Sequence, residues 1–181
     1  MEAHLLPDDR TKLLLSRREE RLIDLSLLNA LYRTPKPGNE AVRRIRSSMG
    51  ISAEEAMSLD DELSIIGHNL FGHPENMSED RERHEQVMPR EPRKTGTAWD
   101  DMPKIEAELL PDGRISYTLA RGELPIFAGA IDMMLENLTP HRNDSGRAEV
   151  RLVVGAEIED LEALRDELRR LGREMRVKGP S

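Results

Sequence analysis

Histidines are the side chains best suited to metal chemistry in this chain, because the sequence contains no cysteine. His68, His73 and His84 occur close together, in the segments G-H-N-L-F-G-H and R-H-E. Three such ligands with one open position would suit a metal-dependent hydrolase, with Glu75 or Glu85 as general base. The separation of His68 and His73 does not place both on one face of a helix. Solvated loop histidines are therefore the favoured interpretation, and the hydrolase is a less favoured alternative.

Paired carboxylates are common in the chain but lack the spacing that binds calcium. Asp60-Asp61 and Asp100-Asp101 have suitable oxygen ligands, yet neither pair belongs to a D-x-D-x-D-G loop. The sequence also has no G-x-S-x-G nucleophile elbow, no phosphate-binding loop and no dinucleotide-binding fingerprint. We therefore expect a protein without a cofactor that is not an enzyme.

The acidic charge is spread over the whole chain and indicates the class of partner. The formal net charge is −8, and residues 1–72, 73–103 and 104–181 carry −2, −3 and −3 of it. This distribution argues against nucleic acid as a partner and favours a basic protein. No apolar run is long enough to cross a membrane, and the first residues do not resemble a signal peptide. We expect a cytoplasmic protein with no membrane partner, and homo-oligomerisation is left open.

The first 72 residues predict a helical subdomain. Ser16 and Glu19 have the spacing of a capping box, and apolar residues then recur at three- and four-residue steps as far as Tyr32. An earlier start, capped at Asp8 or Asp9, is equally compatible with this pattern. The residues before Ser16 would then extend the same helix.

Two further helices are expected in the same range. Asn39 is suited to cap a helix that ends at Met49, with Gly50 in a left-handed conformation. Ser52 and Glu55 repeat the capping-box spacing and open a third helix towards residue 71.

Residues 41–56 resemble the opening of a helix-turn-helix domain of the repressor type. A basic helix ends in glycine, and a serine-capped helix follows it. The resemblance implies a DNA-binding regulator that uses residues 39–63, with Arg43, Arg44 and Arg46 contacting phosphates. The acidic residues after position 58 depart from this pattern, because they would repel DNA. DNA binding is therefore the second hypothesis.

Residues 73–103 predict a polar, flexible linker. They are rich in charged residues and proline and nearly empty of aliphatic side chains, so they can bury little apolar area. Trp99 is the exception, because a tryptophan in such a segment indicates docking onto a folded part or onto a partner. Met102 follows it closely, and methionine suits adaptable binding surfaces.

The range 104–181 predicts a ββαβα domain with its helices on one face of a small sheet. Alternating apolar residues indicate strands at 105–109 and 115–119, joined by the turn Pro111-Asp112-Gly113. A helix follows from Pro125, a third strand is expected at 148–154, and leucines at helical spacing indicate a final helix at 161–171. The expected fold class of the whole chain is α+β.

Together these observations favour a non-enzymatic protein-binding factor, accessory or inhibitory, of the antitoxin, immunity or inhibitor type. Such a protein would act by steric or allosteric capture of another protein. The expected contact residues are Trp99 and Met102 in the linker, with Arg165 and Arg169 on the last helix, where arginine suits an interface rim.

Overall fold

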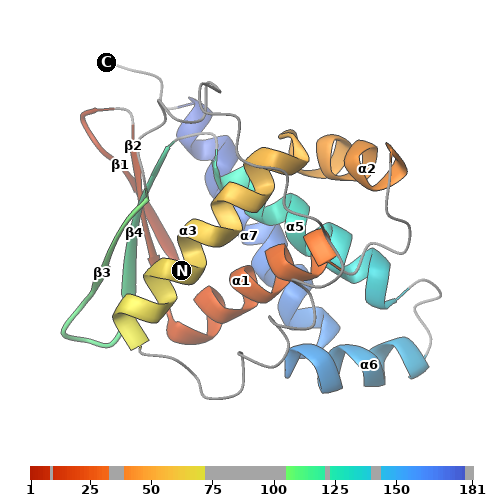
Figure 1. Cartoon of the computed structure of the whole chain (residues 1–181). Helices are drawn as coiled ribbons and strands as arrows, with labels where there is room; N and C mark the ends of the chain where they lie inside the picture. The colour runs from red at the N-terminus through yellow and green to blue at the C-terminus, as the bar shows by residue number, and fades with distance from the viewer. Residues whose placement is uncertain (9, 33–38, 72–104, 121–122, 140–143, 178–181) are drawn as a thin grey trace.

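A computed structural model describes residues 1–8, 10–32, 39–71, 105–120, 123–139 and 144–177 of the chain (Figure 1). Its elements, in chain order, are β1 (Glu2–Leu5), β2 (Arg10–Leu15), α1 (Arg17–Tyr32), α2 (Asn39–Met49), α3 (Ala53–Phe71), β3 (Glu106–Leu109), β4 (Ile115–Ala120), α5 (Glu123–Leu138), α6 (Asp144–Val154) and α7 (Ile158–Val177).

The strands form one antiparallel sheet in the order β1-β2-β4-β3. Its centre is the pairing of β2 with β4, where Leu13 lies opposite Tyr117 and Leu15 opposite Ile115. These four side chains are buried and point to the same face, as alternation along each strand requires. The strands that flank this centre, β1 and β3, form the two edges of the sheet.

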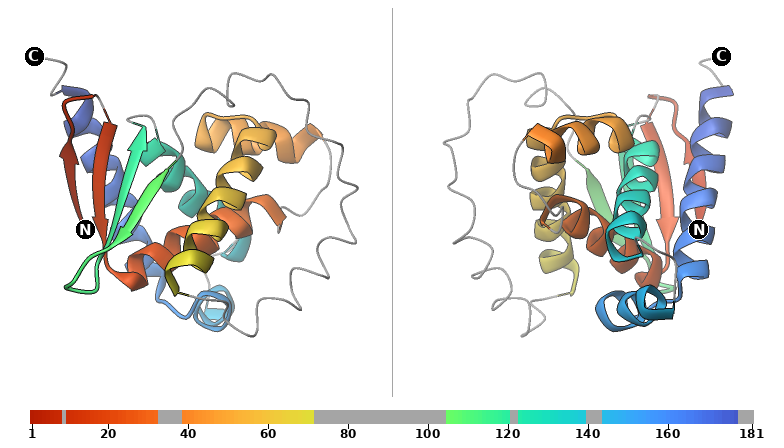
Figure 2. Two further views of the ribbon diagram at one scale, coloured as in Figure 1. Left: turned by 60° about the vertical axis from the view of Figure 1, so that its left-hand side comes forward. Right: turned by 90° about the vertical axis from the view of Figure 1, so that its right-hand side faces the viewer.

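The helices cover that one face of the sheet. Across this layer the order is α3, α1, α5 and α7, with α3 over the β3 side and α7 over the β1 side (Figures 1 and 2). Helix α2 packs across α5 and approaches it closely at Gly129, where a Cβ atom would lie 2.1 Å from the carbonyl oxygen of Ser48. The expected α+β class, with helices on one face of a small sheet, is confirmed.

Several local predictions are also confirmed. Helix α1 begins after Ser16, whose backbone N–H donates to Glu19 Oε2 at 2.7 Å, while the Glu19 N–H donates to Ser16 Oγ at 3.3 Å. The same reciprocal pair joins Ser52 and Glu55 before α3. Gly113 has a φ of 81° in the turn between β3 and β4, a conformation that glycine adopts without strain.

The third strand expected at 148–154 is wrong, because these residues belong to helix α6. Their apolar side chains alternate in sequence, but Val150 and Val154 are also four residues apart and both are buried. Leu152, in contrast, is 87% exposed, so the alternation does not mark one buried face. The apolar residues of this segment fit both the two-residue repeat of a strand and the 3.6-residue repeat of a helix. In the folded chain their burial follows the helical repeat.

The alternative that extends the first helix upstream of Ser16 is also wrong, because Arg10–Leu15 form strand β2. Thr11, Leu13 and Leu15 are buried and the residues between them are only half-buried, which is the alternation of a strand. Two of the four described strands therefore come from the range expected to be helical. Pairing with β4 decides this outcome, since a central strand gains hydrogen bonds on both sides.

The expected division of the chain into two domains stays a prediction, because residues 73–103 lie outside the described residues. The described parts of both flanking ranges nevertheless contribute strands to one sheet and side chains to one hydrophobic core. Within the described ranges, no helix has the length and apolar character needed to cross a bilayer.

Candidate protein-binding surface

Among the described elements, helix α3 lies at the edge of the helical layer, with α1 packed along one of its sides (Figure 2). The side chains turned away from α1 recur at three- and four-residue steps, which places them on one stripe. We call this stripe the α3 surface; it consists of Glu54, Met57, Asp61, Ile65 and Asn69. Met57 is 38% exposed and Ile65 is 60% exposed. Two large apolar side chains therefore share an outward helix face with two acids.

Strand β3 lies beside α3 and forms one edge of the sheet (Figure 2). The Leu110 N–H donates to the Arg114 carbonyl at 2.8 Å. From this pair onward, every second residue of β3 forms its main-chain hydrogen bonds with β4, and the residues between do not. The N–H and C=O groups of Ala107 and Leu109 consequently point away from β4. Leu109 is also 46% exposed, although its side chain is on the face that the helices cover. We call these backbone groups and the Leu109 side chain the β3 edge.

The start of the β3 edge is fixed by α3. Glu62 Oε1 accepts a hydrogen bond of 2.7 Å from the backbone N–H of Ile105. On the opposite face of the sheet, Glu106 and Glu108 are exposed, and Glu106 pairs with Arg10 at 2.8 Å. Within the described residues, the β3 edge thus presents outward-pointing backbone groups between two glutamates on one face and an exposed leucine on the other.

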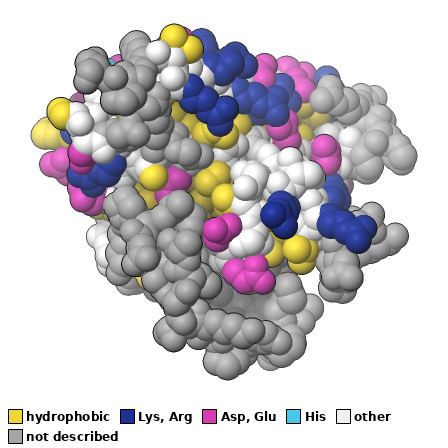
Figure 3. Space-filling view, turned by 90° about the horizontal axis from the view of Figure 1, so that it is seen from above, with side chains coloured by type: hydrophobic (Ala, Val, Ile, Leu, Met, Phe, Trp, Pro, Cys, Tyr) yellow, Lys and Arg dark blue, Asp and Glu magenta, His cyan; other side chains and the backbone are white. Residues whose placement is uncertain are grey.

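Arg165 and Arg169, expected as partner contacts, both bind Asp132 on α5. The Arg165 Nη1 to Asp132 Oδ1 distance is 3.4 Å, and Arg169 donates to the other oxygen of the same carboxylate. Arg165 also pairs with Asp166 at 2.8 Å. Figure 3 shows basic side chains next to acidic ones on the face seen from above. In the free protein these two arginines hold α7 against α5.

Replacing Asp132 by asparagine is expected to destabilise the protein by about 1 kcal/mol, because two half-exposed ion pairs lose their shared carboxylate. Denaturant unfolding at low salt measures this loss. The matched control is Glu149→Gln on the exposed side of α6, which should change the unfolding midpoint little. Equal midpoints for the two variants would show that the Asp132 pairs do not stabilise the α5–α7 contact.

The arginines of the helix-turn-helix hypothesis do not share one face. Arg43 and Arg46 are exposed on α2, whereas Arg44 turns onto α5 and donates to Glu136 Oε2 at 2.9 Å. Glu54 and Glu55 then occupy the first turn of the following helix. Thus one of the three expected phosphate contacts is engaged within the protein.

The other expected site residues cannot be placed. His73, His84, Glu75, Glu85, Trp99 and Met102 lie outside the described residues. His68 belongs to α3, but its side chain is also outside the described part. In the ranges that are described, no group of three histidine, aspartate or glutamate side chains is arranged to hold a metal ion.

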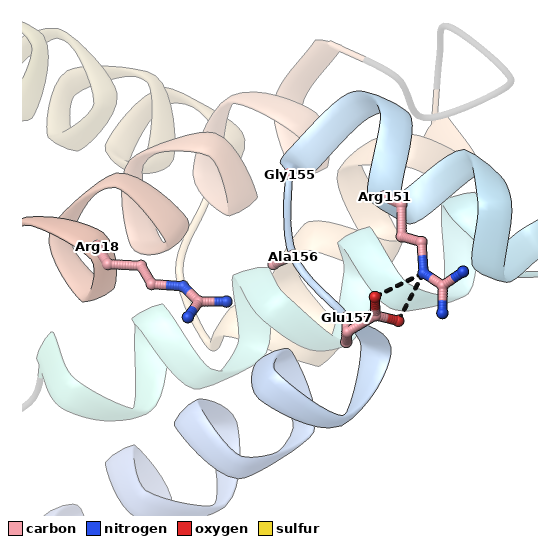
Figure 4. A pocket seen from close by; sticks show the side chains of 5 residues that line it. All are labelled: Arg18, Arg151, Gly155, Ala156 and Glu157. Carbon is pink, nitrogen blue, oxygen red and sulfur yellow. Dashed lines mark hydrogen bonds and ion pairs between the residues drawn. The ribbon is translucent and has the colours of Figure 1, made fainter.

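An open depression of about 230 Å³ lies between Arg18, Arg151 and the loop Gly155–Glu157 (Figure 4). Arg151 pairs with Glu157 at 2.6 Å, and Arg18 pairs with Asp160 at 2.7 Å. Each guanidinium is therefore balanced by a neighbouring carboxylate. This balance gives the depression no excess of positive charge with which to select an anion.

The structure also contains buried carboxyl groups that the sequence analysis missed. Glu20 on α1 is only 9% exposed, and Tyr117 on β4 donates a hydrogen bond of 3.3 Å to its Oε1. Burial and the nearby charge of Asp24 raise the pKa of Glu20 to about 7. Burial alone raises the pKa of Asp24 to about 6. Glu20 shares the helical spacing of the buried Ile23 and Leu27, and this position on the apolar face was the available signal.

A further buried carboxyl, that of Glu123, lies at the first residue of α5. Its Oε2 accepts a hydrogen bond of 2.6 Å from the Ala120 N–H, which joins the end of β4 to α5. Burial raises the pKa of Glu123 to about 7, and the charge of Glu62 acts in the same direction. Burial thus outweighs the hydrogen bonds that Tyr117 and Ala120 donate to these carboxyls, since those bonds favour the ionised form, and the folded protein favours protonated Glu20 and Glu123.

Comparison with protein-family models, curated proteins and solved structures finds no match to this chain. The choice among functions therefore depends on the surfaces described above.

Proposed function

We propose that this chain is a non-enzymatic protein-binding factor, accessory or inhibitory, that captures a partner protein through the α3 surface. The observation that carries the proposal is the exposure of Ile65 and Met57 on one side of an edge helix. The hydration of large apolar side chains is unfavourable, and a partner that covers them removes this unfavourable term. The β3 edge continues this surface with the exposed side chain of Leu109.

The charges around these apolar side chains favour a basic partner. Glu54 and Asp61 flank Met57 on α3, and Glu108 is exposed on the neighbouring strand. Carboxylates at the rim of an interface steer a partner of opposite charge towards it and reject acidic competitors. The net charge of −8 acts in the same direction at longer range.

Affinity capture with the full chain as bait tests this proposal. The wild-type protein should retain one protein partner in stoichiometric amount. Ile65→Asp should reduce the retained amount about tenfold, because a charge would enter the apolar centre of the contact. Leu152→Asp is the matched control, since Leu152 is an exposed apolar residue on α6, away from the α3 surface. Equal capture by the two variants would overturn the assignment of α3 as the contact.

A further inference from the structure

We infer that the β3 edge binds an extended segment of the partner, in which basic and apolar residues alternate, as an additional strand of the sheet. The inference deepens the proposed protein-binding function and depends on it, because it names the partner segment that the α3 and β3 side of the molecule accepts.

Among the described residues, the backbone of β3 has hydrogen-bonding groups that no strand pairs with. In the described part of the chain, β3 has a neighbouring strand only on the β4 side. The N–H and C=O groups of Ala107 and Leu109 point to the other side, and the preceding outward N–H, that of Ile105, is bound by Glu62. An extended peptide can therefore form alternate main-chain hydrogen bonds with Ala107 and Leu109, which is the geometry of β-strand addition.

The outer face of β3 determines the charge of that peptide. Glu106 and Glu108 alternate with the two residues whose backbone groups point away from β4, and both side chains are exposed. Cross-strand pairs of opposite charge stabilise a sheet, whereas like charges placed opposite each other destabilise it. Lysine or arginine at alternate positions of the incoming strand would lie opposite these glutamates and would pair mainly with Glu108, because the Glu106 carboxylate already pairs with Arg10.

The same glutamates disfavour a second copy of this chain as the occupant. In an antiparallel pairing of two β3 strands through Ala107 and Leu109, Glu108 would lie opposite Glu108 or Glu106 of the other copy. Charged residues on an edge strand are a known means of preventing such self-association. The charge of the β3 edge thus disfavours pairing with β3 of a second copy and favours pairing with a basic strand.

The inner face of β3 determines the remaining positions of the peptide. The side chains of Ala107 and Leu109 point towards the helical layer, and Leu109 is exposed where that layer ends. The apolar residues that alternate with the basic ones in the incoming strand would face the helical layer. There they would cover the exposed side chain of Leu109. Alternation of basic and apolar residues is therefore the pattern that suits both faces.

Binding of a synthetic peptide of about eight residues, in which lysine and valine alternate, tests the inference. Fluorescence anisotropy should show saturable binding to the wild-type protein. Leu109→Pro should weaken it about tenfold, because proline removes an outward N–H without altering the charge of the protein. Ala3→Pro removes the corresponding N–H on the opposite edge, in β1, and should leave the affinity unchanged. Equal affinities of the Leu109→Pro, Ala3→Pro and wild-type proteins would show attraction by net charge alone and would overturn the inference.

A charge exchange gives a second readout on a folded variant. Glu108→Lys should weaken binding of the lysine–valine peptide several-fold and strengthen binding of a peptide in which glutamate and valine alternate. Absence of binding by the wild-type protein, or an unchanged preference in Glu108→Lys, overturns the inference. The proposed function fails separately, by the loss of stoichiometric capture or by capture that Ile65→Asp does not reduce. If Ile65→Asp reduces capture of the partner and Leu109→Pro does not, the α3 surface is the contact and strand addition to β3 is wrong.

Discussion

Replacing Gly129 by alanine is expected to destabilise the fold by about 3 kcal/mol, the upper part of the range for overpacking substitutions. A Cβ atom at this position would lie 2.1 Å from the Ser48 carbonyl oxygen and 2.9 Å from the Met49 Cα. Both contacts are with backbone, so no side-chain rotation relieves them. Helix α2 would have to move away from α5, which would uncover the buried side chains of Ile45 and Met49.

Gly67→Ala is the matched control for this prediction. Gly67 also lies inside a helix, but nothing lies within 4 Å of the position that its Cβ would occupy. Alanine has the higher helix propensity, so this variant should be more stable than the wild-type protein by about 0.5–1 kcal/mol. Urea unfolding of both variants measures the difference. A Gly129→Ala midpoint at or above that of the wild-type protein would contradict the α2–α5 contact.

The free energy of unfolding is expected to fall as the pH rises from about 5 to about 8. In the folded protein the pKa of Glu20 is raised from 4.5 to about 7, so the folded state binds the proton more tightly than the unfolded state. The resulting stabilisation is complete below the unfolded pKa and is lost as the pH rises through the folded one. Asp24 and Glu123 contribute with the same sign, since their pKa values are also raised.

Glu20→Gln separates the contribution of Glu20 from that of the other acids. Glutamine keeps the shape of a protonated carboxyl, so the variant should be about 2 kcal/mol more stable than the wild-type protein near pH 8 and similar to it near pH 5. Glu149→Gln, on the exposed side of α6, should leave the pH dependence unchanged. Parallel stability curves for Glu20→Gln and the wild-type protein would show that Glu20 does not take up a proton on folding.

The sequence predicted those elements whose signals are local. The β3–β4 hairpin has alternating apolar residues and a Pro-Asp-Gly turn, and the starts of α1 and α3 have capping boxes that close within three residues. Strand β2 was missed because its pattern of three successive leucines, Leu13–Leu15, fits a helix and a buried strand equally well. Only its pairing with β4, which is distant in the sequence, distinguishes the two.

The candidate site was less accessible to sequence reasoning than the fold. Ile65 and Met57 look like core residues of an apolar helix, and their exposure follows from the place of α3 at the end of the helical layer. Strand β3 is an edge strand because β1 and β2, from the start of the chain, extend the sheet on the other side of β4. Neither fact follows from periodicity. The arginines of α7 were identified by type, but Asp132, which binds two of them, lies on another helix.

Hydrogen exchange of the full chain, with and without the co-purified partner, tests the protein-binding role of the α3 and β3 side most directly. Bound partner should slow the exchange of the Ala107 and Leu109 amides and of the amides along α3, because the partner covers them. The amides of α7, at the other edge of the helical layer, should exchange at unchanged rates. Protection confined to α6 and α7, with none in α3 or β3, would contradict the assignment.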